Sequence, residues 1–198
     1  MSSNTDTNPT NTIRPWLRRA FVVTVAVFLG GCGYEEPVGL DGPSTVRTPD
    51  AEQFAVNLAG CDSLRAPEGS KLAFHAYATG AQIYRWSGAA WTFVAPSAGL
   101  FANAGFNGEI GAHYAGPTWE SVSGSKVVGA VLKRCPGEPN AIPWLLLGAV
   151  TTDGPGVFHK VTYIQRVNTV GGNAPAEAGS LTGELVNVPY TAEYFFYR

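Results

Sequence analysis

The residues best suited to acid–base chemistry are His113 and Glu120, which flank a Gly116-Pro117 turn. If the turn brings the two side chains face to face, they form the kind of pair that transfers protons in a hydrolase. The alternative is that both side chains tie the turn together by hydrogen bonds, because a buried glutamate needs a partner. The chain has no nucleophile elbow, zinc-protease helix, phosphate loop or dinucleotide fingerprint. The sequence therefore favours, without deciding, a protein that is not an enzyme and that uses no cofactor.

Three histidines together could hold a metal ion with an open fourth position. His75, His113 and His159 are each isolated in the sequence, with no second histidine two or four residues away. The cysteines have no partner at C-x-x-C spacing either. We therefore expect no metal site.

A second set of residues is better suited to binding a ligand than to catalysis: Trp119, Gln165, Arg166 and Asn168. An aromatic face with a few polar groups fits a glycan or a small aromatic ligand. Burying an unpaired arginine side chain costs roughly several kcal/mol. A position of Arg166 beside a strand interior therefore has to be explained. One explanation is a buried ion pair with Glu120 that joins two strands. The other is a pocket in which Arg166 orients an anionic or hydroxylated ligand over Trp119.

Short strands must position these residues, because no amphipathic helical repeat lasts for three turns. Ser87-Gly88 and Ser123-Gly124-Ser125 are typical hairpin connections, since glycine supplies the positive φ that such loops need. The expected strands are 71–78, 81–86, 91–95, 110–114, 118–122, 126–133, 144–150, 157–168 and 190–197. This spacing predicts an all-β, single-domain sandwich or barrel-like fold of about eight to nine short antiparallel strands.

Composition agrees with this fold class and argues against one class of partner. Charged residues make up only 14% of the 198 residues, against about 25% in an average soluble domain. Residues 1–31 hold three of the 13 basic and one of the 15 acidic side chains, so the remainder carries a formal charge near −4. Binding to a phosphate backbone needs clustered Lys and Arg, so we expect no nucleic-acid partner.

The beginning of the chain has the pattern of an export signal. Arg18-Arg19 precedes an apolar run of about ten residues, which is too short for the roughly 20 residues of a transmembrane helix. Leu29-Gly30-Gly31-Cys32 follows and resembles the lipobox of bacterial lipoproteins, in which the cysteine is lipidated and becomes the mature N-terminus. The alternative is an ordinary secretory signal. Arg18-Arg19 also partly matches the twin-arginine motif, which leaves the export route open between that pathway and the general secretory one.

These features divide the chain into a signal peptide (1–31), a Pro/Gly-punctuated tether (32–60) and a β-rich domain (61–198). Lipid on Cys32 would hold the domain at a membrane, in the periplasm or on the cell surface. Lipidation of Cys32 leaves Cys61 and Cys135 as an even pair in an oxidising compartment. We therefore expect a Cys61–Cys135 disulfide, with two buried free thiols as the alternative.

Several segments between about residues 66 and 198 carry a resemblance to a known family. They include Gln82-Ile83-Tyr84, Ala115-Gly116-Pro117-Thr118-Trp119-Glu120, Ile142-Pro143-Trp144-Leu145-Leu146, residues 161–169 and Val188-Pro189-Tyr190-Thr191-Ala192. Together they resemble the secreted family known as domain of unknown function 3455. The resemblance implies no particular activity.

One departure from that family has a structural implication. Family members commonly carry one cysteine near the position of Arg85-Trp86 and a second near the position of Glu177-Ala178, and this chain has neither. The joint loss of both cysteines implies that residues near 85 lie close to residues near 178.

For function, the residues favour a lipid-anchored binding or envelope-interaction module. A hydrolase-like enzyme using His113 and Glu120, and a purely structural envelope lipoprotein, are the alternatives.

Overall fold

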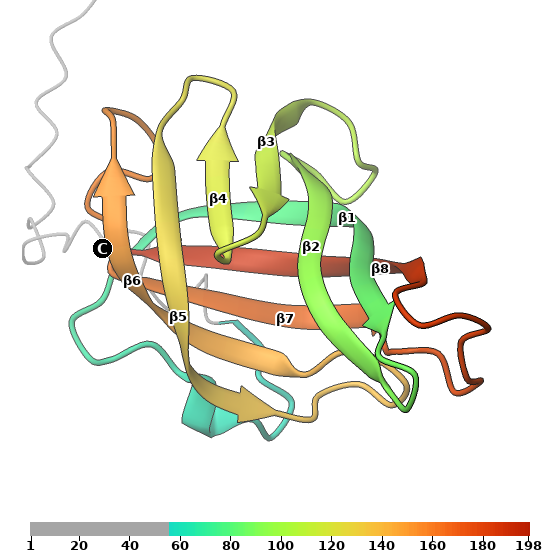
Figure 1. Cartoon of the computed structure of the whole chain (residues 1–198). Coiled ribbons are helices and arrows are strands. Elements are labelled where there is room, and N and C mark those ends of the chain that lie inside the picture. Colours follow the sequence, from blue (N-terminus) through green and yellow to red (C-terminus); the bar gives the residue numbers. More distant parts are fainter. Residues whose placement is uncertain (1–55) are drawn as a thin grey trace, which may run out of the picture. The chain divides into compact units, whose positions relative to one another are not determined.

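A computed structural model describes residues 56–198, which form a closed barrel of eight strands (Figure 1). The signal segment, Cys32 and most of the expected tether lie outside the described residues. A short 3-10 helix, η2 (Asp62–Leu64), precedes the barrel. The strands are β1 (Leu72–Trp86), β2 (Trp91–Phe101), β3 (Glu109–Tyr114), β4 (Thr118–Ser121), β5 (Lys126–Cys135), β6 (Trp144–Asp153), β7 (Tyr163–Gly171) and β8 (Leu185–Tyr197).

Each strand pairs antiparallel with the next one in the chain, and β8 returns to pair with β1. The register of this closing pair runs from Leu72 opposite Tyr197 to Arg85 opposite Leu185. The all-β, antiparallel prediction is confirmed, and of the two architectures that it allowed the chain adopts the barrel. Among residues 56–198, no helix is long and apolar enough to cross a membrane.

Several expected strand boundaries were wrong. Strand β2 extends to Phe101 instead of ending at 95, and β8 begins at Leu185 instead of 190. The segments 71–78 and 81–86 form the single strand β1, which continues through Gly80. A Cβ at Gly80 would lie 2.2 Å from the carbonyl oxygen of Ser97, so glycine there allows β1 and β2 to approach closely. The expected strand 157–168 begins only at Tyr163, because the preceding residues form a turn in which Lys160 has a φ of 61°.

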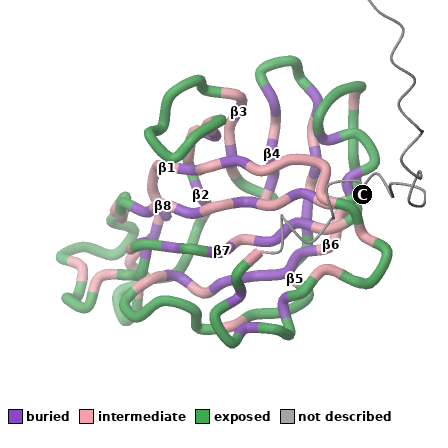
Figure 2. Tube along the Cα trace, turned by 180° about the vertical axis from the view of Figure 1, so that it is seen from behind, coloured by how far each residue is buried: buried purple, intermediate pink, exposed green. Residues whose placement is uncertain are grey.

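The up-and-down path gives the barrel two ends. The packed end, bounded by loops 102–108, 122–125 and 154–162, is filled with aromatic side chains. Phe74 stacks on Phe196 with ring centroids 4.4 Å apart, and Phe158 lies 5.1 and 5.0 Å from these two rings. Buried positions alternate with more exposed ones along the strands that surround this core (Figure 2).

A second apolar cluster lies on the outer side of the barrel wall, under the segment that precedes β1. Leu58 and Leu64 pack there against Trp144, Leu146 and Val167. A disulfide joins Cys61 in this segment to Cys135 at the end of β5, with Cα atoms 5.9 Å apart. The structure therefore contains the predicted disulfide. Packed residues begin before position 61, since Val56 and Leu58 already belong to this cluster.

The long loop 172–184 folds back on the hairpin between β1 and β2. The indole Nε1 of Trp91 donates to the carbonyl oxygen of Glu177 at 2.8 Å. A Cβ at Gly179 would lie 2.6 Å from Cγ of Trp86, so the indole packs directly on the backbone there. Residues near 85 thus lie close to residues near 178, as the family resemblance implied.

Candidate ligand-binding site

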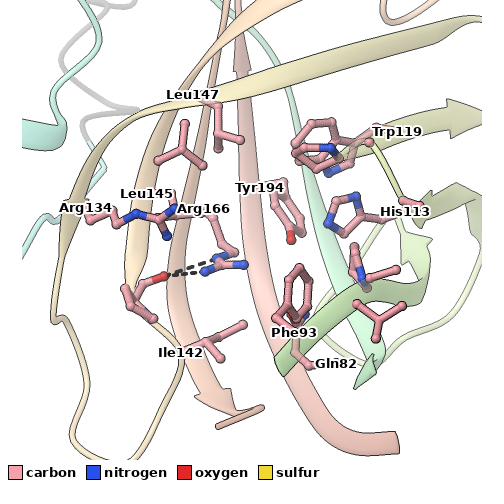
Figure 3. A pocket seen from close by; sticks show the side chains of 18 of the residues that line it. Gln82, Phe93, His113, Trp119, Arg134, Ile142, Leu145, Leu147, Arg166 and Tyr194 are labelled. Carbon is pink, nitrogen blue, oxygen red and sulfur yellow. Dashed lines mark hydrogen bonds between the residues drawn. The ribbon is translucent and has the colours of Figure 1, made fainter. Parts of the chain in front are cut away.

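A cavity of about 590 Å³ occupies the other, open end of the barrel, which is bounded by loops 87–90, 115–117, 136–143 and 172–184. This volume is within the range of roughly 300–1,000 Å³ found for small-molecule sites. Its polar lining residues are Gln82, Tyr84, His113, Arg134, Arg166 and Tyr194, and the other lining side chains are apolar or aromatic apart from glycine (Figure 3).

Arg166 is the charged group that projects into this cavity from the barrel wall. It lies on β7 two residues after Ile164, whose side chain is in the barrel core, so strand alternation turns both side chains inward. Its Nε and Nη2 donate to the carbonyl oxygen of Pro143 at 3.2 and 2.7 Å. A guanidinium has five N–H groups, so the carbonyl oxygen of Pro143 does not use all of its donors.

No acidic side chain is among the described residues that line the cavity. Arg134, an exposed residue near the end of β5, lines it together with Arg166. Two arginines without a carboxylate, in a concave site with mostly apolar walls, give a positive potential that favours anions. This local charge is opposite in sign to the formal charge of the chain, which is −2.

His113 and Trp119 form one wall of the cavity. They are cross-strand partners on β3 and β4, and their rings stack with centroids 4.4 Å apart. The Nδ1–H of His113 donates to the carbonyl oxygen of Thr118 at 2.8 Å. Burial lowers the pKa of His113 to about 3, and the charge of Arg166 adds to this shift against the opposing effect of the Thr118 hydrogen bond. The imidazole is therefore neutral at physiological pH, with its remaining nitrogen, Nε2, as a hydrogen-bond acceptor.

Three further polar atoms of the lining are buried and have no hydrogen-bond partner among the described residues. They are Nε2 of Gln82, Nε1 of Trp119 and the hydroxyl of Tyr194. Their residues are at most 2% exposed. Burial raises the pKa of Tyr194, so its hydroxyl keeps the proton. Unpaired buried donors are rare in proteins and cost free energy, so these atoms are donors that a polar group reaching the wall of the cavity could satisfy.

Glu120 does not belong to this site. It follows Trp119 on β4, so it faces the outer side of the wall, where it accepts a hydrogen bond from the hydroxyl of Tyr114 at 2.5 Å. Lys126 Nζ lies 3.5 Å from the same carboxylate. The hydrogen bond from Tyr114 is the largest cause that lowers the pKa of Glu120. The structure thus contains neither the expected pairing of His113 with Glu120 nor the alternative ion pair of Glu120 with Arg166.

Comparison with known proteins places the chain in a family. The family model described as protein of unknown function (DUF3455) matches residues 67–198. The chain belongs to the DUF3455 family. No curated protein and no solved structure matches the chain.

The DUF3455 match includes all eight strands and every residue that lines the cavity. Cys61 and the helix η2 precede the matched residues. The disulfide to Cys135 therefore fastens a segment outside the family match to a strand inside it.

The other two residues predicted for ligand binding face away from the cavity. Gln165 lies in the outer cluster, where its Nε2 donates to the carbonyl oxygen of Leu64 at 2.7 Å and its Oε1 accepts from the hydroxyl of Tyr197. Asn168 is exposed and donates to Oε1 of Glu193 at 2.9 Å. Of the four predicted residues, the structure brings Trp119 and Arg166 together in the DUF3455 cavity and places Gln165 and Asn168 outside it.

Tyr194, Arg134 and Phe93 also line the site and were not predicted from the sequence. For Tyr194 a signal was present, because Tyr190, Ala192, Tyr194 and Phe196 occupy alternate positions, as on one face of a strand. Arg134 and Phe93 gave no such signal, since register shifts interrupt the alternation in β5 and in the pairing of β1 with β2.

The three histidines lie apart. His113 is in the cavity, His75 lies 2.8 Å from Glu193 between Nε2 and Oε2, and His159 lines a hollow beside the 154–162 loop at the packed end. Within residues 56–198, no group of three or more His, Cys, Asp or Glu side chains is arranged to hold a metal ion.

Proposed function

We propose that this protein is an extracytoplasmic binding module whose barrel holds a small, largely apolar organic anion. The observation that carries the proposal is Arg166, which projects into a mostly apolar cavity of about 590 Å³ with no acidic side chain in its lining. Arg166 is half-buried, and a half-buried guanidinium without a carboxylate is costly unless its charge has a function. A ligand carboxylate would pair with the free N–H groups of Arg166 in the bidentate manner that guanidinium geometry favours.

The contact with Pro143 supports a role in orientation. Two N–H groups of Arg166 are held by one carbonyl oxygen, so the guanidinium plane is fixed before a ligand arrives. Preorganised groups lose less conformational entropy on binding. The body of the ligand would lie against Leu145, Leu147 and the ring of Trp119, which supply apolar surface.

Two further elements belong to this proposal. Lipid on Cys32 would tether the barrel to a membrane, as Leu29-Gly30-Gly31-Cys32 indicates. The Cys61–Cys135 disulfide supports a location outside the cytoplasm, because disulfides persist in oxidising compartments. The hydrolase alternative loses its main support, since His113 and Glu120 lie on opposite sides of the barrel wall.

The test is a thermal-shift screen of the full chain, with the same detergent in every sample. The panel holds aromatic and aliphatic carboxylates, their uncharged amides, and neutral glycans. Carboxylates should raise the melting temperature in a concentration-dependent way, because a ligand that binds only the folded state stabilises it by mass action. A shift from glycans alone, or from no compound, would favour a glycan-binding or a purely structural protein instead.

A further inference from the structure

We propose that the cavity selects an aromatic carboxylic acid that also carries a hydroxyl group, and that His113 determines this specificity by accepting a hydrogen bond from that hydroxyl. The inference rests on the proposed anion-binding function and adds a second recognition point to it.

The His113 imidazole carries its proton on Nδ1. Thr118 presents a carbonyl oxygen to Nδ1, and a carbonyl only accepts hydrogen bonds, so Nδ1 carries the proton. The ring is neutral because it is only 2% exposed and its pKa is lowered to about 3. Nε2 must then present a lone pair. None of the described residues donates a hydrogen bond to this nitrogen.

The other polar groups around the cavity are hydrogen-bond donors. Arg166 and the hydroxyl of Tyr194 offer N–H and O–H groups, and so do the unpartnered atoms of Gln82 and Trp119. These groups are donors suited to a carboxylate. His113 Nε2 is an acceptor and therefore needs a ligand group of the opposite kind. A hydroxyl is the simplest such donor. It is uncharged, so the positive charges of the two arginines do not repel it.

Arg166 and His113 lie on different sides of the cavity. Figure 3 shows the Arg166 side chain extending from one side of the cavity, with His113 and Trp119 on the other side and Tyr194 between them. The rings of His113 and Tyr194 lie 5.1 Å apart in an edge-to-face arrangement. The donor for the anion and the acceptor for the hydroxyl thus face the same space from opposite sides, so one ligand of modest length can meet both.

The walls between these two points favour a flat ligand. Flat aromatic side chains line much of the space, namely Tyr84, Phe93, Trp119 and Tyr194. Tyr84 and Phe93 themselves form an edge-to-face pair with centroids 5.8 Å apart. Aromatic rings favour partners that are also flat, through offset stacking and edge contacts. A hydroxylated aromatic acid combines the anion, the donor and the flat body that the three parts of the wall require.

A matched set of probes tests this inference by isothermal titration of the full chain. The set comprises cinnamate with its 2-, 3- and 4-hydroxy isomers, and 2-naphthoate with 6-hydroxy-2-naphthoate. At least one hydroxylated probe should bind about tenfold tighter than its parent acid or more, because a site built to accept a hydroxyl rejects the analogue that lacks it. In His113→Phe, which keeps a flat ring without an acceptor, this preference should disappear while the unsubstituted acid still binds.

His159→Phe is the control variant, because His159 is exposed at the packed end, and it should keep the preference. Nitrogen-15 NMR of histidine in the unmodified chain gives a second readout that does not depend on the folding of a variant. The Nε2 signal of His113 should move on addition of the preferred hydroxy acid and should not move with the unsubstituted acid. If acids bind through Arg166 with no preference for any hydroxylated probe, the specificity is refuted and the anion site stands. If no acid binds, the proposed function itself fails and this inference with it.

Discussion

The imidazole of His113 lies against the indole of Trp119 inside the barrel, with ring centroids 4.4 Å apart and planes inclined by only 11°. The pairing of β3 with β4 places the two residues directly opposite each other. The same alternation that turns them inward turns Glu120 outward. This arrangement makes His113 a buried, neutral polar group in the wall of a cavity.

Acidification should destabilise the barrel through His113. Its pKa is about 3 in the folded chain and near 6.5 when exposed. Between these pH values the unfolded chain binds a proton that the folded chain does not bind, so stability falls as the pH falls. The contribution is fully present above about pH 6.5 and is lost toward pH 3, at up to about 1.4 kcal/mol per pH unit. Urea unfolding at a series of pH values measures this slope.

The variant His113→Gln should weaken that pH dependence, because glutamine takes up no proton. Burial also lowers the pKa of His75, so some dependence of the same sign should remain in the variant. His159→Gln is the matched control and should keep the slope of the parent protein. Identical slopes for the parent protein and His113→Gln would show that His113 is not buried in its neutral form.

Removal of the disulfide should destabilise the barrel strongly. Cys61 and Cys135 are 74 positions apart in the sequence, so in the chain-entropy account the bridge stabilises the fold by about 4 kcal/mol. The double variant Cys61→Ala/Cys135→Ala should unfold at correspondingly lower urea concentration, and reduction of the parent protein should have a similar effect. Alkylation of two thiols in the parent protein before any reduction would contradict the disulfide.

Packing of the 172–184 loop on the β1–β2 hairpin should depend on the glycine at position 179. A methyl group there would lie 2.6 Å from Cγ of Trp86, so Gly179→Ala should cost about 1–3 kcal/mol, as overpacking generally does. The control is Gly105→Ala, where the nearest atoms belong to the side-chain amides of Asn103 and Asn107. It should change stability by less than about 0.5 kcal/mol. Equal melting temperatures for the two variants would contradict the close contact.

Membrane association should depend on Cys32. The chain with Cys32→Ala has no acceptor for a lipid and should move from the membrane fraction to the soluble fraction on cell fractionation. Gly33→Ala keeps the cysteine and should stay with the membrane. A mature N-terminus other than Cys32 in the parent protein, determined by mass spectrometry, would refute lipidation at this site.

The strands and hairpins could be predicted from the sequence, but closure of the barrel could not. The turns at Ser87-Gly88 and Ser123-Gly124-Ser125 are local features, and both hairpins form where they were expected. Closure depends on the pairing of β1 with β8, which are separated by about a hundred residues and show no local signal. A break was expected at Gly80 because glycine usually weakens a strand. In the structure, β1 continues through this glycine, which lets β1 and β2 approach closely.

The site could be predicted only in part, because a side chain's direction depends on register. Pro117 lies in the turn, and pairing outward from it sets His113 opposite Trp119 and Ala112 opposite Glu120. Proximity in sequence had instead indicated a pair of His113 with Glu120. On β7, Gln165 and Arg166 are neighbours in sequence, and alternation sends one to the outer cluster and the other into the cavity. The barrel wall therefore separates residues that are neighbours in the sequence.

The variant that isolates the charge of the proposed site is Arg166→Gln. The amide nitrogen of glutamine takes the place of the arginine Nε, which donates to the carbonyl oxygen of Pro143, so the variant should fold with nearly the melting temperature of the parent protein. Lys133→Gln removes an exposed charge from the same wall and serves as the control.

The most direct test is isothermal titration of the full chain with 2-naphthoate and with its uncharged amide, 2-naphthamide. The parent protein and Lys133→Gln should bind the carboxylate about tenfold to a hundredfold tighter than the amide, which corresponds to a charge-assisted hydrogen-bond pair of roughly 1.5–3 kcal/mol. In Arg166→Gln this preference should vanish. Equal affinity of the parent protein for the two compounds, or binding of neither, would contradict the account of the barrel as an anion-binding module.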